Sequence, residues 1–515
     1  MAPVVLIILD GWGLIHKNKG NAVELARKPN FDRLWSEHPH TRLNAHGKYV
    51  GLPDNQVGNS EAGHMNIGAG RIIKQDAVLV SEAIVDGRFQ KNLALNETIR
   101  NVIAHKSSLH LMGLISENES PHSALDHLYA LVDLAYIRGV QRVYLHLFTD
   151  GRDSRQFATI NVIDKIIKKI DGQAQVATLI GRYYAMDRGK NWERTEKAYR
   201  CLVESKGLIF ESPHEALLHA YNQQKTDEYI EPSIIAHKKS TITESRIKDD
   251  DGIIFFNLRS DRARQLTKVF VQKDFNKLNL GAFKRGPMLK NLSFCTLTDF
   301  GPDLDNIKAA FPSADIKNTL PMILKGRKQI YIAETEKYAH MTYFINGGYA
   351  DKVAGEDRVH IRSKKVISYA DIPEMRAYEL TTMVRLLLVQ RKYDFIAVNF
   401  ANPDMVGHTG NLKATIKAIE DVDKCLGMIT QAVLKKDGIL IVTADHGNAE
   451  KMIDLETNEV WAGHTTNQVP FIIVSNKKIR KLRTDGVLGD IAPTIYDLLG
   501  VKDLPTELNN SLIKK

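Results

Sequence analysis

The chain has 515 residues, of which 43% are hydrophobic and 25% charged. This composition is that of a folded soluble protein and excludes a disordered one. The length predicts two, at most three, compact units. The formal net charge is +9 at pH 7, but the basic residues are scattered, so a solvated surface is a better interpretation than a nucleic-acid interface.

The cysteines and the N-terminus indicate a cellular compartment. Cys201, Cys295 and Cys425 are too few and too far apart for a disulfide framework and form no CxxC motif, so we expect a reducing cytoplasm. The apolar run from Val4 to Leu9 has no basic segment before it and ends at Asp10. It predicts a buried strand, neither a signal peptide nor a membrane span, and no later run is long enough to cross a bilayer.

Taken in chain order, the apolar patterns alternate between strands and helices. A strand at 3–9 precedes a helix over 21–37 that is broken near Pro29, and a helix over 76–84. Further strands are expected at 109–115, 143–148, 175–180, 253–257 and 292–297, with helices at 123–137, 160–170, 193–204 and 261–271. From about Phe311 a second set has strands at 330–333, 395–400, 439–443 and 471–474 and helices at 411–434 and 490–499. This alternation predicts an α/β fold with two sheets.

A glycine-rich turn, VGNSEAGHMN at 57–66, is suited to hold a nucleophile. Gly58 permits a sharp approach, and Ser60, Glu61 and Ala62 can open a helix whose free N–H groups face an anion at the hydroxyl. The alternative interpretation is that Ser60 is an ordinary helix cap.

Three aspartates each follow an apolar run: Asp10 after VVLIIL, Asp404 after FIAVNFANP and Asp445 after ILIVTA. Ligands of open α/β sheets bind outside the carboxyl ends of the strands, so these side chains are expected to meet at one site. His408 lies four residues after Asp404, which puts both on one face of a helix. Two further imidazoles are available, from His446 and His464.

Oxygen and nitrogen donors without thiolate suit Mn²⁺, Zn²⁺ or Fe²⁺, and their number predicts two ions. A natural partition gives one ion Asp404, His408 and His464, and the other Asp10, Ser60, Asp445 and His446. Any one of these residues alone is more simply explained as a cap or a surface histidine. A divalent ion at the Ser60 oxygen would favour its alkoxide form without a general base. A Ser-His-Asp triad is the alternative, although GxSxG is absent.

A second group of side chains is cationic and lies mainly between the two strand sets. Arginine forks match carboxylate and phosphate oxygens, so arginines at strand ends predict a clamp for an anionic substrate. The alternative is ordinary surface arginine. The group consists of Arg152, Asp153, Arg182, Arg188, Arg259 and Arg262.

The motifs resemble those of the cofactor-independent phosphoglycerate mutases of the alkaline phosphatase superfamily, in order from residue 9 to residue 467. They are LDGWG, GNSEAGHMNIGAGR, FTDGRD, GRYYAMDR, NLRSDRARQ, AETEKYAH, NPDMVGHTG, TADHGNAE and GHTTN. The resemblance implies a phosphatase-like metal domain of residues 1–74 and 310–515, with a substrate-binding transferase domain, 75–309, inserted into it. It places the family's two metal ions, usually Mn²⁺, on the residues partitioned above and makes Ser60 the phosphorylated serine.

The same resemblance makes all six residues of the cationic group substrate contacts, together with His122 and Lys337. Asp153 would bind a substrate hydroxyl and assist its proton transfers, and the alternative is an ion pair with Arg152 or Arg155. The implied reaction passes the phosphate of 3-phosphoglycerate to Ser60 and returns it to the other hydroxyl to give 2-phosphoglycerate, without bisphosphoglycerate. Closure of the inserted domain, on hinges near 74–77 and 305–311, would exclude water.

Two other functions are compatible with parts of the sequence. Another metal-dependent phosphohydrolase or a phosphopentomutase would share the Asp/His pattern but not the inserted arginine motifs. The interpretation as a basic nucleic-acid-binding protein rests on the net charge of +9 alone. We expect a monomer that binds neither nucleic acid nor membrane.

The chain departs from the family pattern at four places. The segment 117–121, ENESP, replaces the usual Asp-Gly-Gly-Val before His122; Ser260 and Gln468 replace prolines, and Ala62 replaces valine. None removes a metal ligand or the nucleophile. Activity is therefore expected to survive, with substrate affinity the property most at risk.

Overall fold

The computed structural model describes residues 2–117, 120–236, 239–301, 303–304, 307–312 and 315–514. Two compact units form: unit 1 is Met1–Gln75 with Asp315–Lys515, and unit 2 is Asp76–Ala314. The division expected from the sequence was at 74 and 309. Residues 118–119 of the ENESP segment and 305–306 of the second expected hinge lie outside the described residues.

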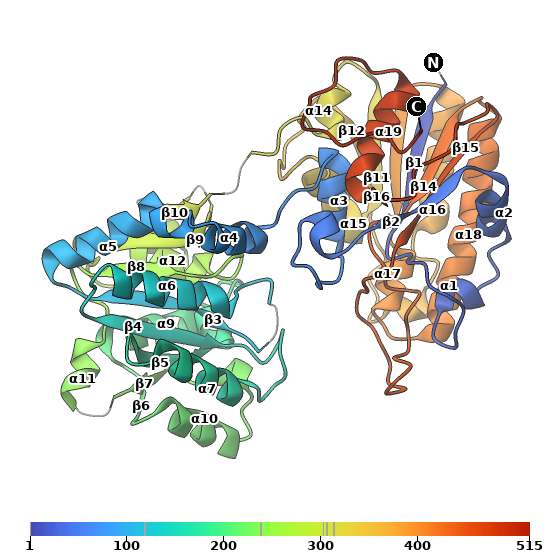
Figure 1. Cartoon of the computed structure of the whole chain (residues 1–515). Helices are drawn as coiled ribbons and strands as arrows, with labels where there is room; N and C mark the ends of the chain where they lie inside the picture. Colours follow the sequence, from blue (N-terminus) through green and yellow to red (C-terminus); the bar gives the residue numbers. More distant parts are fainter. Residues whose placement is uncertain are drawn as a thin grey trace. The chain divides into compact units, whose positions relative to one another are not determined.

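The sheet of unit 1 is mixed and runs through the middle of the unit (Figure 1). In order across the sheet, its strands are β12 (Asp357–Ile361), β11 (Gln329–Glu334), β13 (Phe395–Phe400), β1 (Val4–Leu9), β14 (Ile439–Thr443), β15 (Val469–Ser475), β2 (His40–Asn44) and β16 (Gly486–Val487). The strands from β12 to β14 are parallel, whereas β15 is antiparallel to both its neighbours. Every side chain of β1 is buried, as expected for a central parallel strand with helices on both faces.

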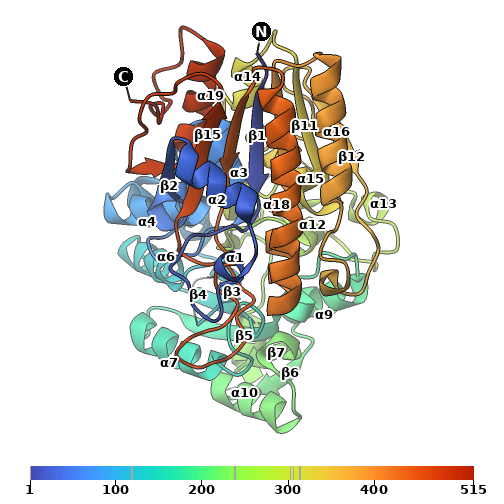
Figure 2. The same cartoon turned by 90° about the vertical axis from the view of Figure 1, so that its right-hand side faces the viewer.

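Helices cover both faces of this sheet. α2 (Pro29–Glu37), α16 (Ala377–Gln390) and α18 (Leu412–Leu434) lie on the face turned toward the viewer in Figure 2, with α16 beside α18. The opposite face carries α3 (Ser60–Ala69), α14 (Leu320–Ile323) and α19 (Ile491–Leu499). Three short helices, α1 (Ala22–Leu25), α15 (Thr335–Ala339) and α17 (Asn402–Gly407), lie in loops that follow strands.

The sheet of unit 2 is parallel apart from one strand pair. Its order is β10 (Ile307–Phe311), β9 (Ser293–Thr298), β8 (Gly252–Phe255), β3 (Leu109–Ile115), β4 (Val143–Thr149), β5 (Gln175–Gly181), β7 (Ser233–Ile235) and β6 (Leu208–Phe210). Among the described strands of unit 2, only β5 and β7 pair antiparallel. The carboxyl ends of β8, β3, β4 and β5 therefore share one edge.

Two apolar cores flank the sheet of unit 2, so its helices also lie on both faces. One core is formed with α4 (Asp76–Val85), α5 (Leu93–His105), α6 (Leu125–Ile137), α7 (Thr159–Ile170) and α10 (Pro213–Asn222). The other is formed with α8 (Arg182–Ala185), α9 (Trp192–Glu204), α12 (Arg264–Val271) and α13 (Phe275–Leu278), and α11 (Lys239–Glu244) follows β7. The predicted α/β class with two sheets is confirmed.

Two sequence-based expectations can be compared directly with this fold. Cys201, Cys295 and Cys425 are buried free thiols, so no disulfide links them, as predicted. Within the described ranges, no helix has both the length and the apolar content needed to cross a bilayer.

Candidate metal centre

Three aspartates meet where adjacent strands of unit 1 end. Asp10 directly follows β1, Asp404 lies in α17 just beyond β13, and Asp445 follows β14. β1 is parallel to both neighbours, and their last residues are in register or nearly so. All three aspartates are at most 2% exposed. The structure thus brings together the three carboxylates that the sequence placed at one edge.

The hydroxyl of Ser60 lies inside this cluster. Asn59, not Ser60, caps α3, because its side-chain oxygen accepts a backbone hydrogen bond at 2.8 Å. The interpretation of Ser60 as an ordinary cap is therefore wrong. Its Oγ lies 2.9 Å from His446 Nε2 and 3.3 Å from Asp10 Oδ1, and accepts a hydrogen bond from Lys337 Nζ at 2.7 Å. This first residue of α3 points at ionisable groups from three distant segments.

Asp404 forms a compact group with two histidines. Its Oδ1 is 3.2 Å from His408 Nε2 and 3.3 Å from His464 Nε2, and these two nitrogens are 3.0 Å apart. In both histidines, Nδ1 is 2.8 Å from a backbone carbonyl, that of Ala462 or of Gly58. Because a carbonyl only accepts, Nδ1 carries the proton of each neutral ring and Nε2 presents a lone pair to the group. Asp404 and His408 therefore point to the same place, as their four-residue spacing predicted.

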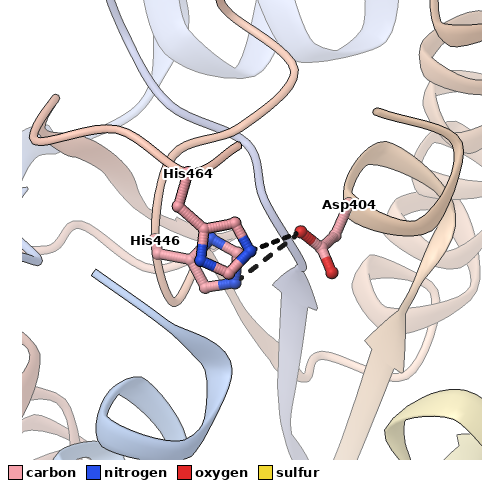
Figure 3. A group of neighbouring side chains, drawn as sticks. All are labelled: Asp404, His446 and His464. Atoms are coloured by element: carbon pink, nitrogen blue, oxygen red, sulfur yellow. Dashed lines mark ion pairs between the residues drawn. The ribbon is translucent and has the colours of Figure 1, made fainter. Parts of the chain in front are cut away.

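His446 lies between the two predicted ligand groups. Its Nε2 is 3.6 Å from Asp10 Oδ1 and 3.9 Å from Asp404 Oδ1. Figure 3 shows the rings of His446 and His464 close together and facing Asp404. The centroids of the two rings are 4.0 Å apart. Ligand atoms of Asp404, His446 and His464 lie within 4.8 Å of one another. By distance alone His446 is within reach of either predicted ion.

The surroundings of His446 do not form a Ser-His-Asp triad. In a triad, the carboxylate accepts from the ring nitrogen remote from the serine. Here Nδ1 faces the carbonyl of Gly447 at 3.3 Å, whereas Asp10 and Asp445 approach the same Nε2 that faces Ser60, at 3.6 and 3.5 Å. Crowding of carboxylates, hydroxyl and one imidazole lone pair around a common point is typical of metal ligands.

His64 is a further residue of this centre that sequence reasoning missed. It lies one helical turn after Ser60 in α3, and its Nδ1 is 3.2 Å from Asp445 Oδ2 and 3.0 Å from the Ser60 carbonyl. Asn399 donates from Nδ2 to Asp10 Oδ2 at 2.7 Å and faces His64 Nε2 at 3.0 Å. Nε2 therefore accepts and Nδ1 carries the proton, so His64 orients Asp445. Ligand atoms of Asp10, His64 and Asp445 also lie within 4.8 Å of one another. The four-residue spacing from Ser60 was the available sequence signal.

Lys337, on α15, supplies the main positive charge of the cluster. Its Nζ is 2.6 Å from both Asp10 Oδ1 and Asp404 Oδ2. Burial lowers the pKa of this ammonium, but the charges of Asp10, Asp404 and Asp445 outweigh burial and raise it above its ordinary value. The sequence resemblance made Lys337 a substrate contact, and the structure places it against Ser60 and two of the predicted ligands.

The charges of the cluster suit a divalent cation. Three buried carboxylates face one ammonium, and the contacts of Asp445 Oδ2 are with imidazole nitrogens, those of His64 at 3.2 Å and His446 at 3.5 Å. Burial, together with the charge of Asp445, raises the pKa of Asp10 to about 7. Burial also raises the pKa of Asp404, but Lys337 together with His408, His464 and His446 outweighs burial and holds that pKa well below its ordinary value. Unpaired carboxylates buried this deeply are costly unless a cation compensates them.

The cationic group of unit 2 gathers at the shared edge of its parallel strands. His122 follows β3, Arg152 and Asp153 follow β4, and Arg182 begins α8 directly after β5. Arg259 and Arg262 follow β8 in a turn, because α12 begins only at Arg264 and not at the expected residue 261. Arg188 lies beyond α8 and pairs with Asp261 at 2.7 Å.

Ion pairs hold part of this group in place. Arg182 is 3% exposed and binds Asp150 at 2.5 Å and Asp153 at 2.8 Å. Burial raises the pKa of Asp153, but Arg182 outweighs it and lowers that pKa below its ordinary value. The suggested pairing of Asp153 with Arg152 or Arg155 is therefore wrong: Arg155 instead pairs with Glu117, and Arg152 with Glu228 at 3.5 Å.

Arg262 differs from its neighbours because it forms no ion pair in the described part of the chain. Its guanidinium is partly buried, and burial followed by the charges of Arg182, Arg188 and Arg152 lowers its pKa. An unpaired guanidinium among like charges is a favourable site for a carboxylate or a phosphate.

His122 predicts a pH effect on stability. Burial, assisted by the charge of Arg182, lowers its pKa from 6.5 to about 4. Between these values the unfolded chain binds more protons, so this residue makes the free energy of unfolding fall as pH falls from about 6.5 to about 4. His122→Gln should therefore flatten that dependence in urea unfolding at pH 7, 6 and 5, relative to the exposed control His105→Gln. Parallel curves for the two variants would contradict the assignment.

Known proteins that resemble this chain also support a metal site. A family model described as the metalloenzyme superfamily matches residues 2–503. Proteins named 2,3-bisphosphoglycerate-independent phosphoglycerate mutase are 46% identical in Clostridium botulinum and 47% identical in Clostridium kluyveri, each alignment covering 99% of both chains. A crystal structure of Leishmania mexicana phosphoglycerate mutase, at low cobalt concentration, matches with a TM-score of 0.74 and 29% identity over 100% of this chain and 98% of that one. This metal-binding enzyme therefore belongs to the family of 2,3-bisphosphoglycerate-independent phosphoglycerate mutases.

Proposed function

We propose that the chain interconverts 3-phosphoglycerate and 2-phosphoglycerate by passing the phosphate through Ser60. The observation that carries the proposal is the position of the Ser60 hydroxyl, which contacts Asp10, His446 and Lys337 inside a buried carboxylate cluster. The names of the full-length relatives support the substrate.

We further propose that two Mn²⁺ ions bind to this cluster of carboxylates and imidazoles. Asp404, His408 and His464 would hold one, and Asp10, Ser60, Asp445 and His446 the other. Bound ions would lower the pKa of the serine hydroxyl and neutralise charge on the phosphoryl group. The excess of buried carboxylate charge and the Nε2 lone pairs facing Asp404 support this donor set.

In the first transfer, Ser60 Oγ gives up its proton and bonds to phosphorus while the bond from phosphorus to the substrate's O3 breaks. Lys337 Nζ, 2.7 Å from Oγ, offsets the negative charge of the transferring group. The released O3 takes up a proton and leaves glycerate bound. Arg182 holds Asp153, which we place at the substrate hydroxyls, where it would relay this proton.

In the second transfer, the 2-hydroxyl of glycerate gives up its proton and bonds to phosphorus as the bond to Ser60 Oγ breaks. The serine regains its proton, so no phosphate is consumed and no bisphosphoglycerate is needed. Arginines that bind the carboxylate would retain glycerate between the two transfers. The domain closure expected from the sequence to exclude water stays a prediction.

The direct test supplies purified protein with 3-phosphoglycerate and Mn²⁺, omits bisphosphoglycerate and follows products by phosphorus NMR. The proposal predicts 2-phosphoglycerate at equilibrium with the substrate. Inorganic phosphate as the main product would instead indicate a phosphohydrolase, because water would then have replaced glycerate as the acceptor.

Arg262→Ala is expected to raise KM for 3-phosphoglycerate by about 10- to 100-fold, because a hydrogen bond to a charged group contributes about 1.5–3 kcal/mol. The side chain forms no ion pair among the described residues, so its removal breaks no internal pairing. Steady-state kinetics would measure the effect against Arg88→Ala, which removes an exposed arginine of the same unit. Equal KM values for the two variants would place the substrate elsewhere.

We also propose that the enzyme acts in the cytoplasm as a monomer without a nucleic-acid partner. The buried free thiols are compatible with a reducing compartment. Sedimentation would test the monomer. A DNA-binding assay over a range of salt concentrations would test whether the protein binds nucleic acid, since electrostatic binding weakens with salt.

A further inference from the structure

The proposed chemistry leaves one buried carboxylate of this region without a role. Glu450 follows the strand-end residues Asp445 and His446, is 0% exposed, and forms no ion pair with Lys or Arg in the described ranges. A buried carboxylate without a counter-ion is stable only when donors satisfy its oxygens. The partners of Glu450 therefore indicate why it is there.

Four donors converge on the carboxylate, two on each oxygen. Oε2 accepts from the backbone N–H of Gly13 at 3.1 Å and of Asn448 at 2.8 Å. Oε1 accepts from Asn467 Nδ2 at 2.9 Å and from the Thr465 hydroxyl. All four partners donate, so both oxygens of the carboxylate have their hydrogen-bonding capacity used.

These donors belong to three loops, and each loop carries a proposed metal ligand. Gly13 lies in the loop that begins with Asp10, Asn448 in the loop of Asp445 and His446, and Thr465 directly follows His464. The connection extends to a fourth segment, because Asn448 Nδ2 donates to Asp404 Oδ1 at 3.0 Å. The Glu450 carboxylate thus links three loops directly, and Asn448 extends the connection to a fourth segment.

The loops approach the carboxylate so closely that side chains are excluded. A Cβ added to Gly13 would lie 2.2 Å from Glu450 Cδ, and one added to Gly447 would lie 2.4 Å from Glu450 Oε1. The backbone is therefore shaped around this group, and a small displacement of the group would move the loops with it.

We propose that Glu450 is a positioning residue that sets the placement of the ligand-bearing loops, and thereby the affinity of the centre for divalent ions. The inference rests on the proposed metal site, but it concerns hydrogen bonds that the protein itself makes. Glutamine cannot replace the carboxylate fully: the N–H groups of Gly13 and Asn448 cannot invert, so the amide NH₂ of glutamine would have to face Thr465 and Asn467, which now donate.

Glu450→Gln should raise the Mn²⁺ dissociation constant about 10-fold or more, since outer partners of metal ligands typically contribute 10- to 100-fold. Titration of Mn²⁺ into the purified full-length variant, followed by electron paramagnetic resonance, measures this without any substrate. Asp423→Asn is the matched control: Asp423 is a buried carboxylate of unit 1 that accepts three hydrogen bonds from Asn30 and Phe31, away from every proposed ligand. It should lower Tm and leave Mn²⁺ affinity within twofold of wild type.

Two further variants keep the inference testable if Glu450→Gln does not fold. Thr465→Val and Asn467→Ala each remove one donor and leave the carboxylate in place. Each should weaken Mn²⁺ binding, and each should add little to Glu450→Gln because all three act through one group. Mn²⁺ affinity within twofold of wild type in folded Glu450→Gln, or in both donor variants, would overturn the inference. Wild-type protein that binds Mn²⁺ but forms no 2-phosphoglycerate would instead end the proposed function alone.

Discussion

Ser60→Ala is expected to reduce turnover by at least about 10⁴-fold, the scale seen when a covalent nucleophile is removed. In the described part of the chain, no other hydroxyl is hydrogen-bonded to His446 or Lys337. No neighbouring group can therefore take over the phosphate. Coupled assays in both directions would measure the loss.

The loss should be accompanied by loss of the covalent intermediate. Rapid quenching of wild-type protein with 3-phosphoglycerate, followed by peptide mass spectrometry, should find one phosphoryl group on Ser60 and none on the variant. Ser511→Ala is the control: this serine of the same unit hydrogen-bonds Asp497 and contacts no proposed ligand, so turnover should be unchanged. Turnover by Ser60→Ala within tenfold of wild type would exclude a phosphoserine route.

The second large effect is expected from Lys337→Met, measured in metal-free protein. Lys337 Nζ bridges Asp10 and Asp404, and all three groups are buried. Removal of one partner from a buried ion pair leaves uncompensated charge and typically costs about 3–5 kcal/mol. Urea unfolding in the presence of a chelator should therefore show a large fall in the stability of unit 1.

Addition of Mn²⁺ should restore much of that stability, because bound cations would compensate the same carboxylates. Catalysis should remain impaired, since the ammonium that contacts Ser60 is missing. Lys28→Met is the control: Lys28 is as buried, but its partners Asp32 and Glu24 are more exposed, so the change should cost less than about 1 kcal/mol. Equal destabilisation of the two variants, with or without Mn²⁺, would contradict a carboxylate cluster built for cations.

The placement of the metal centre was predictable because its elements have strong local signals. The runs before Asp10, Asp404 and Asp445 form buried parallel strands, and parallel strands with helices on both faces contain little except apolar residues. Their ends then mark the site. Elements with weaker signals were missed. The buried positions of β2 alternate, but one of the two is the polar Thr41, so the sequence shows no apolar alternation there. In α16, Leu386 and Val389 are exposed, which blurs the apolar face of the helix.

Residues that orient the ligands were harder to predict, for a physical reason. His64, Asn399 and Glu450 act through contacts with segments hundreds of residues away, and nothing in their own neighbourhoods requires those contacts. The N-cap of α3 was equally hard to predict from the sequence. Asn59 and Ser60 are both good N-cap residues, and only the folded structure shows which of them caps the helix. Local sequence signals find the ends of strands, whereas packing determines what supports the side chains there.

Anomalous diffraction at the manganese edge, from crystals soaked with Mn²⁺, would show directly whether the buried carboxylates and imidazoles hold cations beside the serine. Two peaks are predicted, one bonded to Asp404, His408 and His464 and the other to Asp10, Ser60, Asp445 and His446. A single peak, or peaks that leave the Ser60 oxygen without a metal neighbour, would contradict activation of the hydroxyl by this centre.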